Sequence, residues 1–134
     1  MNVLVIDGQG GGIGKLLVSE IKSEYPDFFV TAVGANSIAT SAMLKAGADA
    51  AATGENAVCV GCRKANVIAG PVGIVIADAL LGEITPKMAA AIGQSDAKRV
   101  LVPVNHCDNI VVGVGDIPMA KLVQSAVKEI GKGS

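Results

Sequence analysis

The sequence predicts an α/β protein with a Rossmann-like, doubly wound fold, in which one domain over residues 1–134 holds a mainly parallel sheet of five or six strands. Short apolar runs alternate with segments of helical periodicity, as they do in proteins built from βαβ units. A glycine-rich turn joins the first predicted strand to the first predicted helix, which is the place of the phosphate-binding turn in doubly wound folds. A length of 134 residues suits a single domain.

The first half of the chain alternates three predicted strands with three predicted helices. Apolar runs typical of buried strands cover residues 3–6, 28–33 and, with a weaker signal, 48–52. Helical periodicity covers residues 15–25, 38–46 and 57–65. Pro26 and Gly47 end the first two helices, and Asn36 or Ser37 is a candidate N-cap of the second.

The second half predicts two or three further strands. The fourth strand begins at residues 67–69 and is interrupted by residues 70–73, while residues 74–81 fit a strand and a helix equally. Thr85 followed by Pro86 predicts a helix that runs to about Gln94. Later apolar runs predict a strong fifth strand and a C-terminal strand that folds back as a hairpin, at residues 99–104 and 109–114. Asp116 is the predicted cap of a last helix, whose apolar face holds Met119, Leu122, Val123, Ala126, Val127 and Ile130.

The composition narrows the classes of function. Apolar residues make up 51% of the chain and charged residues 17%, against about 25% charged in a typical soluble domain. This apolar surplus predicts a subunit interface and hence a homo-oligomer. A net charge of -1 and an aromatic content of 2% argue against a nucleic-acid partner.

Targeting and membrane signals are not visible in the sequence. No apolar run reaches the roughly 18 residues of a membrane-spanning helix. The apolar start at residues 3–6 is too short for a signal peptide and is followed at once by Asp7. We therefore expect a cytoplasmic protein without a membrane partner, and three cysteines argue against a disulfide framework.

Residues 8–14, Gly-Gln-Gly-Gly-Gly-Ile-Gly, are the strongest functional signal. They open the first helix, where free backbone N–H groups and a partial positive charge favour an anion. The loop therefore predicts a site for a nucleotide or another phosphate-bearing ligand, formed by Gly8, Gly10, Gly11, Gly12, Ile13, Gly14 and Lys15. The alternative is that the glycines only let the first helix pack closely on the sheet.

The spacing of the glycines matches some known types of phosphate-binding loop and not others. The dinucleotide pattern G-x-G-x-x-G fails, because its last glycine falls on Ile13. Gly8, Gly12 and Gly14 fit G-x-x-x-G-x-G, a spacing that resembles the cofactor loop of short-chain dehydrogenases. That family pairs a Tyr with a Lys four residues later, whereas Tyr25 is followed at that distance by Phe29.

The tail of the loop, residues 11–15, also looks like the phosphate loop of nucleotide hydrolases. In that comparison Gln9 stands where the first glycine belongs, and Leu16 stands where a Ser or Thr holds magnesium. A magnesium-dependent hydrolase is therefore disfavoured. The loop does not identify a cofactor, and NAD(P) and other nucleotides stay open as candidates.

Further polar and glycine residues are expected at the edge of the sheet where the strands end, which is also the place of the glycine loop. We call this edge the rim. Asp7 ends the first strand and either holds a ligand hydroxyl or metal, or bonds the N–H groups of its own loop. Asn36 and Ser37 follow the second strand, where an acidic residue that holds a ribose is missing, and they could bond a ribose or a phosphate. Gly70 and Gly73 are expected opposite the glycine loop, at the crevice where the strand order reverses.

Three residues are candidates for catalysis at this rim. His106 and Cys107 follow the fifth strand, and they are either an imidazole beside an activated thiol or part of an ordinary polar turn. Glu55 is either an acid or base or a charge at the start of a helix.

A metal site is a weaker hypothesis. Cys59 and Cys62 form a single C-x-x-C, to which Cys107 and its neighbours His106 and Asp108 could add ligands for zinc or a cluster. Cysteines three residues apart on a helix share a face, so the alternative is packing in the core.

Five segments carry a resemblance that extends over nearly the whole chain: residues 6–15, 39–47, 53–57, 81–88 and 102–105. In these segments the chain resembles a family of short bacterial proteins of unknown function. The resemblance implies a Rossmann-like fold and a bacterial cytoplasmic setting, and it carries no activity or catalytic residue. Three functions thus remain open: a phosphate-ligand-binding module, a small enzyme that uses His106, Cys107 or Glu55, and a structural homo-oligomer without a ligand.

Overall fold

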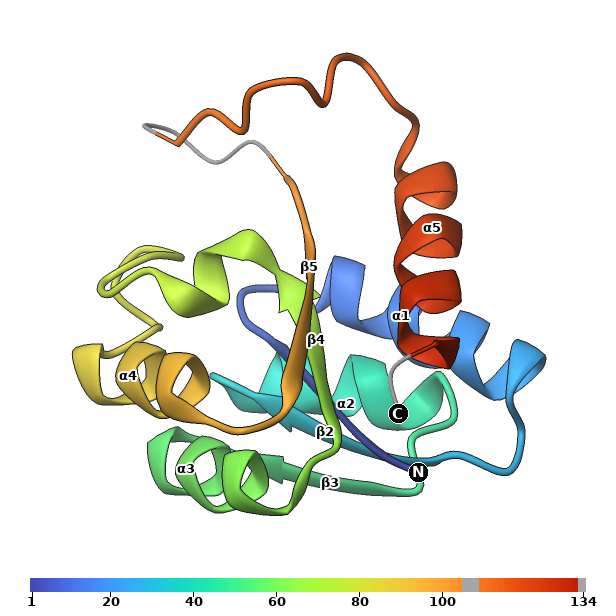
Figure 1. Ribbon diagram of the computed structural model, residues 1–134. Helices are drawn as coiled ribbons and strands as arrows, with labels where there is room; N and C mark the ends of the chain where they lie inside the picture. The colour runs from blue at the N-terminus through green and yellow to red at the C-terminus, as the bar shows by residue number, and fades with distance from the viewer. Residues whose placement is uncertain (105–108, 133–134) are drawn as a thin grey trace.

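The computed structural model describes residues 1–104 and 109–132 and has the predicted Rossmann-like α/β architecture (Figure 1). Five parallel strands form one sheet in the order β3-β2-β1-β4-β5. The strands are β1 (Asn2–Asp7), β2 (Phe29–Gly34), β3 (Ala50–Thr53), β4 (Val67–Pro71) and β5 (Lys98–Val102). The order reverses between β1 and β4, which places the start of α1 beside the switch point of the sheet.

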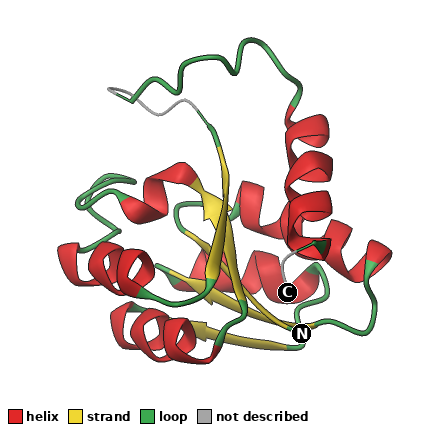
Figure 2. Cartoon of the chain, in the orientation of Figure 1, coloured by secondary structure: helices red, strands yellow, loops and turns green. Residues whose placement is uncertain are grey.

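Helices cover both faces of the sheet (Figure 2). One face carries α1 (Gly12–Glu24), α2 (Ser37–Lys45) and α5 (Met119–Gly131). The other carries α3 (Glu55–Lys64), the 3-10 helix η1 (Val72–Val75) and α4 (Pro86–Gln94). None of the helices within residues 1–104 and 109–132 is both long and apolar enough to cross a membrane.

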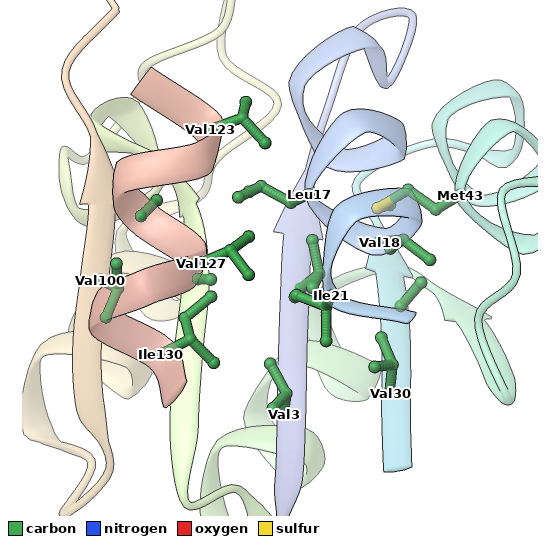
Figure 3. Close-up of a cluster of buried hydrophobic side chains, with 14 of the residues drawn as sticks. Val3, Leu17, Val18, Ile21, Val30, Met43, Val100, Val123, Val127 and Ile130 are labelled. Carbon is green, nitrogen blue, oxygen red and sulfur yellow. The ribbon is translucent and has the colours of Figure 1, made fainter. Parts of the chain in front are cut away.

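The central strand β1 is buried on both faces because apolar side chains alternate between two cores. Val3 and Val5 pack in the core beneath α1, α2 and α5, shown in Figure 3. Leu4 and Ile6 pack in the core beneath α3, η1 and α4. This continuous apolar run is typical of a parallel strand covered by helices on both sides.

Several helices and strands begin or end at other residues than predicted. Helix α1 begins at Gly12 rather than Lys15, so the second half of the glycine loop is already the first helical turn. Strand β4 continues through Gly70 to Pro71, where it was expected to be interrupted. Residues 72–75 form η1, and residues 76–84 form turns rather than a strand or a helix.

The predicted C-terminal hairpin strand is wrong over residues 110–114, which form no strand; Asn109 makes an isolated β-bridge outside the five-stranded sheet. The aliphatic composition of residues 110–114 favours a strand, but a strand also needs a neighbouring strand and a surface to pack on. Ile110 and Val112 are instead exposed. The cap of the last helix is also wrong, since α5 begins at Met119 and its N-cap is Pro118 rather than Asp116.

Candidate functional site at the start of helix α1

The carboxyl end of β1 leads into a tight turn and then into α1. The N–H of Gly11 donates to the carbonyl of Gly8 at 2.9 Å, and the N–H of Lys15 donates to the carbonyl of Gly11 at 2.9 Å. Gly11, the N-cap, has a φ of 72°, a left-handed conformation that glycine adopts without strain. The turn therefore places the N-terminus of α1 at the rim of the sheet.

Asp7 connects the strand end to the first turn of α1. Its Oδ1 accepts the N–H of Gly8 at 2.8 Å, and its Oδ2 accepts the N–H of Gly14 at 2.7 Å. The residue is only 5% exposed. This geometry supports the interpretation that Asp7 bonds the N–H groups of its own loop, in the manner of a helix cap.

The glycines of the loop divide into two groups. A Cβ on Gly14 would lie 2.5 Å from Met43 Sδ and 2.9 Å from Asp7 Cβ, and a Cβ on Gly11 would lie 2.9 Å from Ala39 Cα. These two glycines allow close packing of α1 on β1 and α2. In contrast, a Cβ on Gly10 or Gly12 would have no heavy atom within 4 Å. Packing therefore explains Gly11 and Gly14 but not the open positions Gly10 and Gly12.

Open backbone donors accompany the open glycines. In residues 1–104 and 109–132, no hydrogen bond uses the N–H of Gly10, Gly12 or Ile13. Gly12 and Ile13 are the first two residues of α1, so their N–H groups have no partner inside the helix. They form the part of the loop at which an anion can be bound.

A groove between α1 and α2 is lined from Lys15 onwards, two residues after Ile13. It has a volume of about 710 Å³ and is lined by Lys15, Lys45, Ser19, Ser37 and Ser41 among others. Ser37 is the first residue of α2, and Asn36 caps that helix by accepting the N–H of Ala39 at 2.9 Å. The groove thus has Lys15 and Ser37 in the first turns of the two helices, while Lys45 lies at the end of α2.

Glu83 is a residue of this rim that the sequence did not reveal. Its Oε1 accepts the N–H of Gln9 at 2.5 Å, and its Oε2 accepts from Asn36 Nδ2 at 2.6 Å. Asn36 Nδ2 also donates to the carbonyl of Gln9 at 2.9 Å. A carboxylate therefore lies between the glycine loop and the end of β2, where the sequence itself lacks the expected acid. No spacing rule could have found it, because 74 positions separate Gln9 from Glu83.

The segment that carries Glu83 contains several residues in the left-handed backbone conformation. Asp78, Leu80 and Leu81 have φ angles of 66°, 57° and 57°, followed by Gly82 at 88°. Left-handed conformations cost non-glycine residues roughly 1–2 kcal/mol each. The turns at residues 76–84 are consequently strained where they approach the rim.

The other candidates for the rim contact neighbouring elements of the fold. The Oε2 of Glu55 accepts a hydrogen bond from Thr85 Oγ1 at 2.6 Å, which joins the start of α3 to the cap of α4. Gly70 is buried in β4, and its Cβ would overlap the carbonyl oxygen of Ile6. Gly73 lies in η1 near Ala79 and Leu80.

Cys59 and Cys62 are both buried on α3 as free thiols. Burial, followed by the neighbouring Cys59, raises the pKa of the Cys62 thiol to about 11. Within the described ranges, no group of three His, Cys, Asp or Glu residues is arranged to hold a metal. His106 and Cys107, proposed for catalysis or metal binding, lie outside the described residues.

Comparison with known proteins identifies a family and a fold. Residues 2–133 match the family described as a domain of unknown function, DUF3842. Comparison with curated proteins finds no match. Among solved structures, the chain is similar to a dodecameric FMN-dependent UbiX-like decarboxylase from Escherichia coli O157:H7, with a TM-score of 0.51 and 18% sequence identity. The match covers 98% of this chain and 76% of the decarboxylase, and it establishes a shared fold.

Proposed function

The chain belongs to the family described as a domain of unknown function, DUF3842, and we propose that it binds a nucleotide or another small phosphate-bearing ligand at the start of α1. The observation that carries this proposal is the open surface at Gly10 and Gly12, where a Cβ would have nothing within 4 Å. Neither glycine has a positive φ, so neither the backbone nor the packing requires a glycine there. Access of a ligand to the backbone is a direct physical reason for glycine at both positions.

The phosphate would accept the N–H groups of Gly12 and Ile13, and the ammonium of Lys15 would add positive charge. Helix N-termini bind anions because their first N–H groups have no internal acceptor and the helix dipole favours negative charge. Lys15 is exposed and lines the adjoining groove. These groups come from one helical turn and need no further rearrangement.

The donors favour a ligand with one phosphate at the loop rather than a pyrophosphate. The carboxylates of Asp7 and Glu83 already accept the N–H groups of Gly8, Gln9 and Gly14. The open donors left in the loop are those of Gly10, Gly12 and Ile13. The similar decarboxylase is named as FMN-dependent, and FMN carries a single phosphate, which agrees with this size of site. NAD(P) remains a second type of candidate.

Isothermal titration calorimetry against FMN, AMP, NAD, NADP, ATP and inorganic phosphate tests the proposal. We expect saturable binding of at least one phosphate ester and loss of that binding in Gly12→Val, whose side chain fills the open position. Gly93→Ala is the matched control, because Gly93 is also a helical glycine with nothing near its Cβ but lies in α4. Absence of binding to every ligand by a folded wild-type protein would contradict the proposal, as would unchanged binding in Gly12→Val.

We also propose that the chain self-associates. The apolar surplus of the composition agrees with several large aliphatic side chains that are exposed, Val112 at 92% and Ile110 at 81% among them. Such side chains are typical of interfaces. The similar decarboxylase is named as dodecameric, which supports assembly of this fold into oligomers. Sedimentation velocity at micromolar concentration tests this, and a monomer would contradict it.

A further inference from the structure

The segment that leads into α5, residues 109–118, stands away from the body of the protein (Figures 1 and 2). We call residues 109–118 the arm. Four of its aliphatic side chains are exposed: Ile110, Val111, Val112 and Ile117. Only one charged residue, Asp116, belongs to the arm. This segment is therefore apolar and largely uncovered in the isolated chain.

A second uncovered apolar surface lies on the face of the sheet that carries α3. A groove of about 530 Å³ between α3 and strands β1 and β2 is lined largely by apolar residues, including Phe29, Val33, Val60 and Gly61. Phe29 is 48% exposed. Lys64 is the only charged residue of the lining. We call this surface the α3 groove.

The arm cannot fill the α3 groove of its own chain. The arm follows the end of β5, which is one edge of the sheet, whereas the groove lies against β1 and β2 towards the other edge. The groove also includes Asn2 and Ala65, which lie where β1 begins and where α3 ends. In Figure 1 the arm and α3 are at opposite ends of the molecule.

We infer that the arm of one copy occupies the α3 groove of a second copy. The two surfaces are complementary in chemistry, since both are apolar and each carries one charge, Asp116 on the arm and Lys64 at the groove. Neither charged group makes an ion pair with any residue in the ranges 1–104 and 109–132. A second copy is the partner that supplies a groove wherever an arm is present.

The area involved suits a small specific contact. Each aliphatic side chain buries about 60–120 Å² of apolar surface, so the four side chains of one arm bury on the order of 400 Å². Each copy gives one arm and receives another, so the arm side chains alone bury on the order of 400 Å² per copy. The groove surface beneath the arm adds to this area, which approaches the roughly 600 Å² per partner at the low end of specific interfaces. Each contact joins two different surfaces, an arm and a groove. Repeating this contact closes the assembly either as a pair of copies or as a ring.

This inference rests on the self-association proposed above and assigns its surfaces. The test uses two variants that should be folded and defective in different surfaces: Ile110→Asp/Val112→Asp on the arm, and Val60→Glu in the groove. We expect each variant alone to sediment as a monomer where the wild type is an oligomer. Mixed together they should form a one-to-one complex that is weaker than the wild-type assembly, because a single contact remains: the intact arm of the groove variant meets the intact groove of the arm variant.

Charge exchange gives a second measurement. Asp116→Lys and Lys64→Asp should each weaken assembly, and the double variant should restore it. Leu44→Asp is the control, because Leu44 is an exposed leucine on α2 outside both surfaces. Circular dichroism checks that every variant is folded.

The outcomes separate the two levels of the proposal. A monomeric wild type would overturn both self-association and the arm exchange. An oligomeric wild type whose arm variant remains oligomeric, or variants that fail to associate when mixed, would overturn only the arm exchange. Phosphate-ligand binding is measured independently by calorimetry and is unaffected by either result.

Discussion

The carboxylate of Asp7 accepts the backbone N–H of Gly14 at 2.7 Å and thereby joins the end of the first strand to the first turn of the first helix. The contact requires α1 to approach β1 closely, which a side chain at position 14 would prevent. The same turn leaves the N–H groups of Gly12 and Ile13 open to the rim. One part of the loop thus stabilises the fold while the neighbouring part remains available to a ligand.

Gly14→Ala should lower the free energy of unfolding by about 1–3 kcal/mol, the usual cost of overpacking a well-filled site. Its Cβ would lie 2.5 Å from Met43 Sδ and 2.9 Å from Asp7 Cβ. Gly93→Ala, in the open surface of α4, should instead raise that free energy by up to about 1 kcal/mol through helix propensity. Urea denaturation of both variants measures the difference, and equal stabilities would mean that position 14 is not tightly packed.

Glu83→Gln should strengthen the binding of inorganic phosphate at the start of α1 about fivefold. The substitution removes a negative charge beside the loop, and one unit charge a few ångströms away contributes about 1 kcal/mol at high dielectric constant. Glutamine keeps an oxygen that can accept the N–H of Gln9. Calorimetry measures the change, with Asp96→Asn, an exposed acid after α4, as the control that should leave affinity unaltered.

Acid should destabilise the protein partly through Asp49. Its Oδ2 accepts the N–H of Val30 at 2.8 Å and the ammonium of Lys22 at 2.9 Å. The hydrogen bond from Val30, followed by Lys22, lowers the pKa of Asp49 below its usual value. The stabilisation is therefore present above the unfolded pKa of about 4 and is lost as the pH falls through the lower folded pKa.

Asp49→Asn removes the charged acceptor, so it should cost about 1–2 kcal/mol at pH 7 and show a weaker loss of stability below pH ~4. Thermal unfolding of the wild type and the variant between neutral and acidic pH provides the comparison. Parallel pH profiles for the two proteins would exclude this role for Asp49.

Leu81→Gly should stabilise the protein by about 0.5–1 kcal/mol. Leu81 is 93% exposed and has a φ of 57°, so a glycine there removes backbone strain without removing packing. The relief of strain exceeds the entropy that glycine loses on folding. The same substitution at Leu44, in helix α2, should destabilise by about 1 kcal/mol. Opposite shifts of the melting temperature are expected, and shifts of equal sign would argue against strain at residue 81.

Cys62 should resist alkylation in the folded protein. With a pKa of about 11, raised mainly by burial, on the order of one thiol in a thousand is ionised at pH 8. Iodoacetamide treatment at pH 8, followed by peptide mass spectrometry, should label Cys62 only after urea is added. Rapid labelling without urea would show that α3 opens or that the thiol is less buried.

Much of the architecture could be predicted from local patterns. The apolar run of β1, the Asn36 cap of α2 and the Thr85-Pro86 start of α4 each depend on residues next to one another in the chain. The apolar face of α5 was predicted for the same reason, and Val123, Ala126, Val127 and Ile130 are buried. The errors fall where the partner is distant or missing, as in residues 110–114, which join no strand of the sheet that residues 1–104 and 109–132 form.

The candidate site shows the same division. The position of the glycine loop between β1 and α1 is a property of adjacent residues, and the sequence by itself determined it, together with the α/β class and the apolar surplus. Only the tertiary structure decided which glycines serve packing, since Gly14 meets Met43 of another helix while Gly12 meets nothing. It also brought Glu83 to Gln9 and Asn36 across the folded chain. Contacts of this kind depend on how helices and turns pack around the sheet, which residue spacing along the chain does not encode.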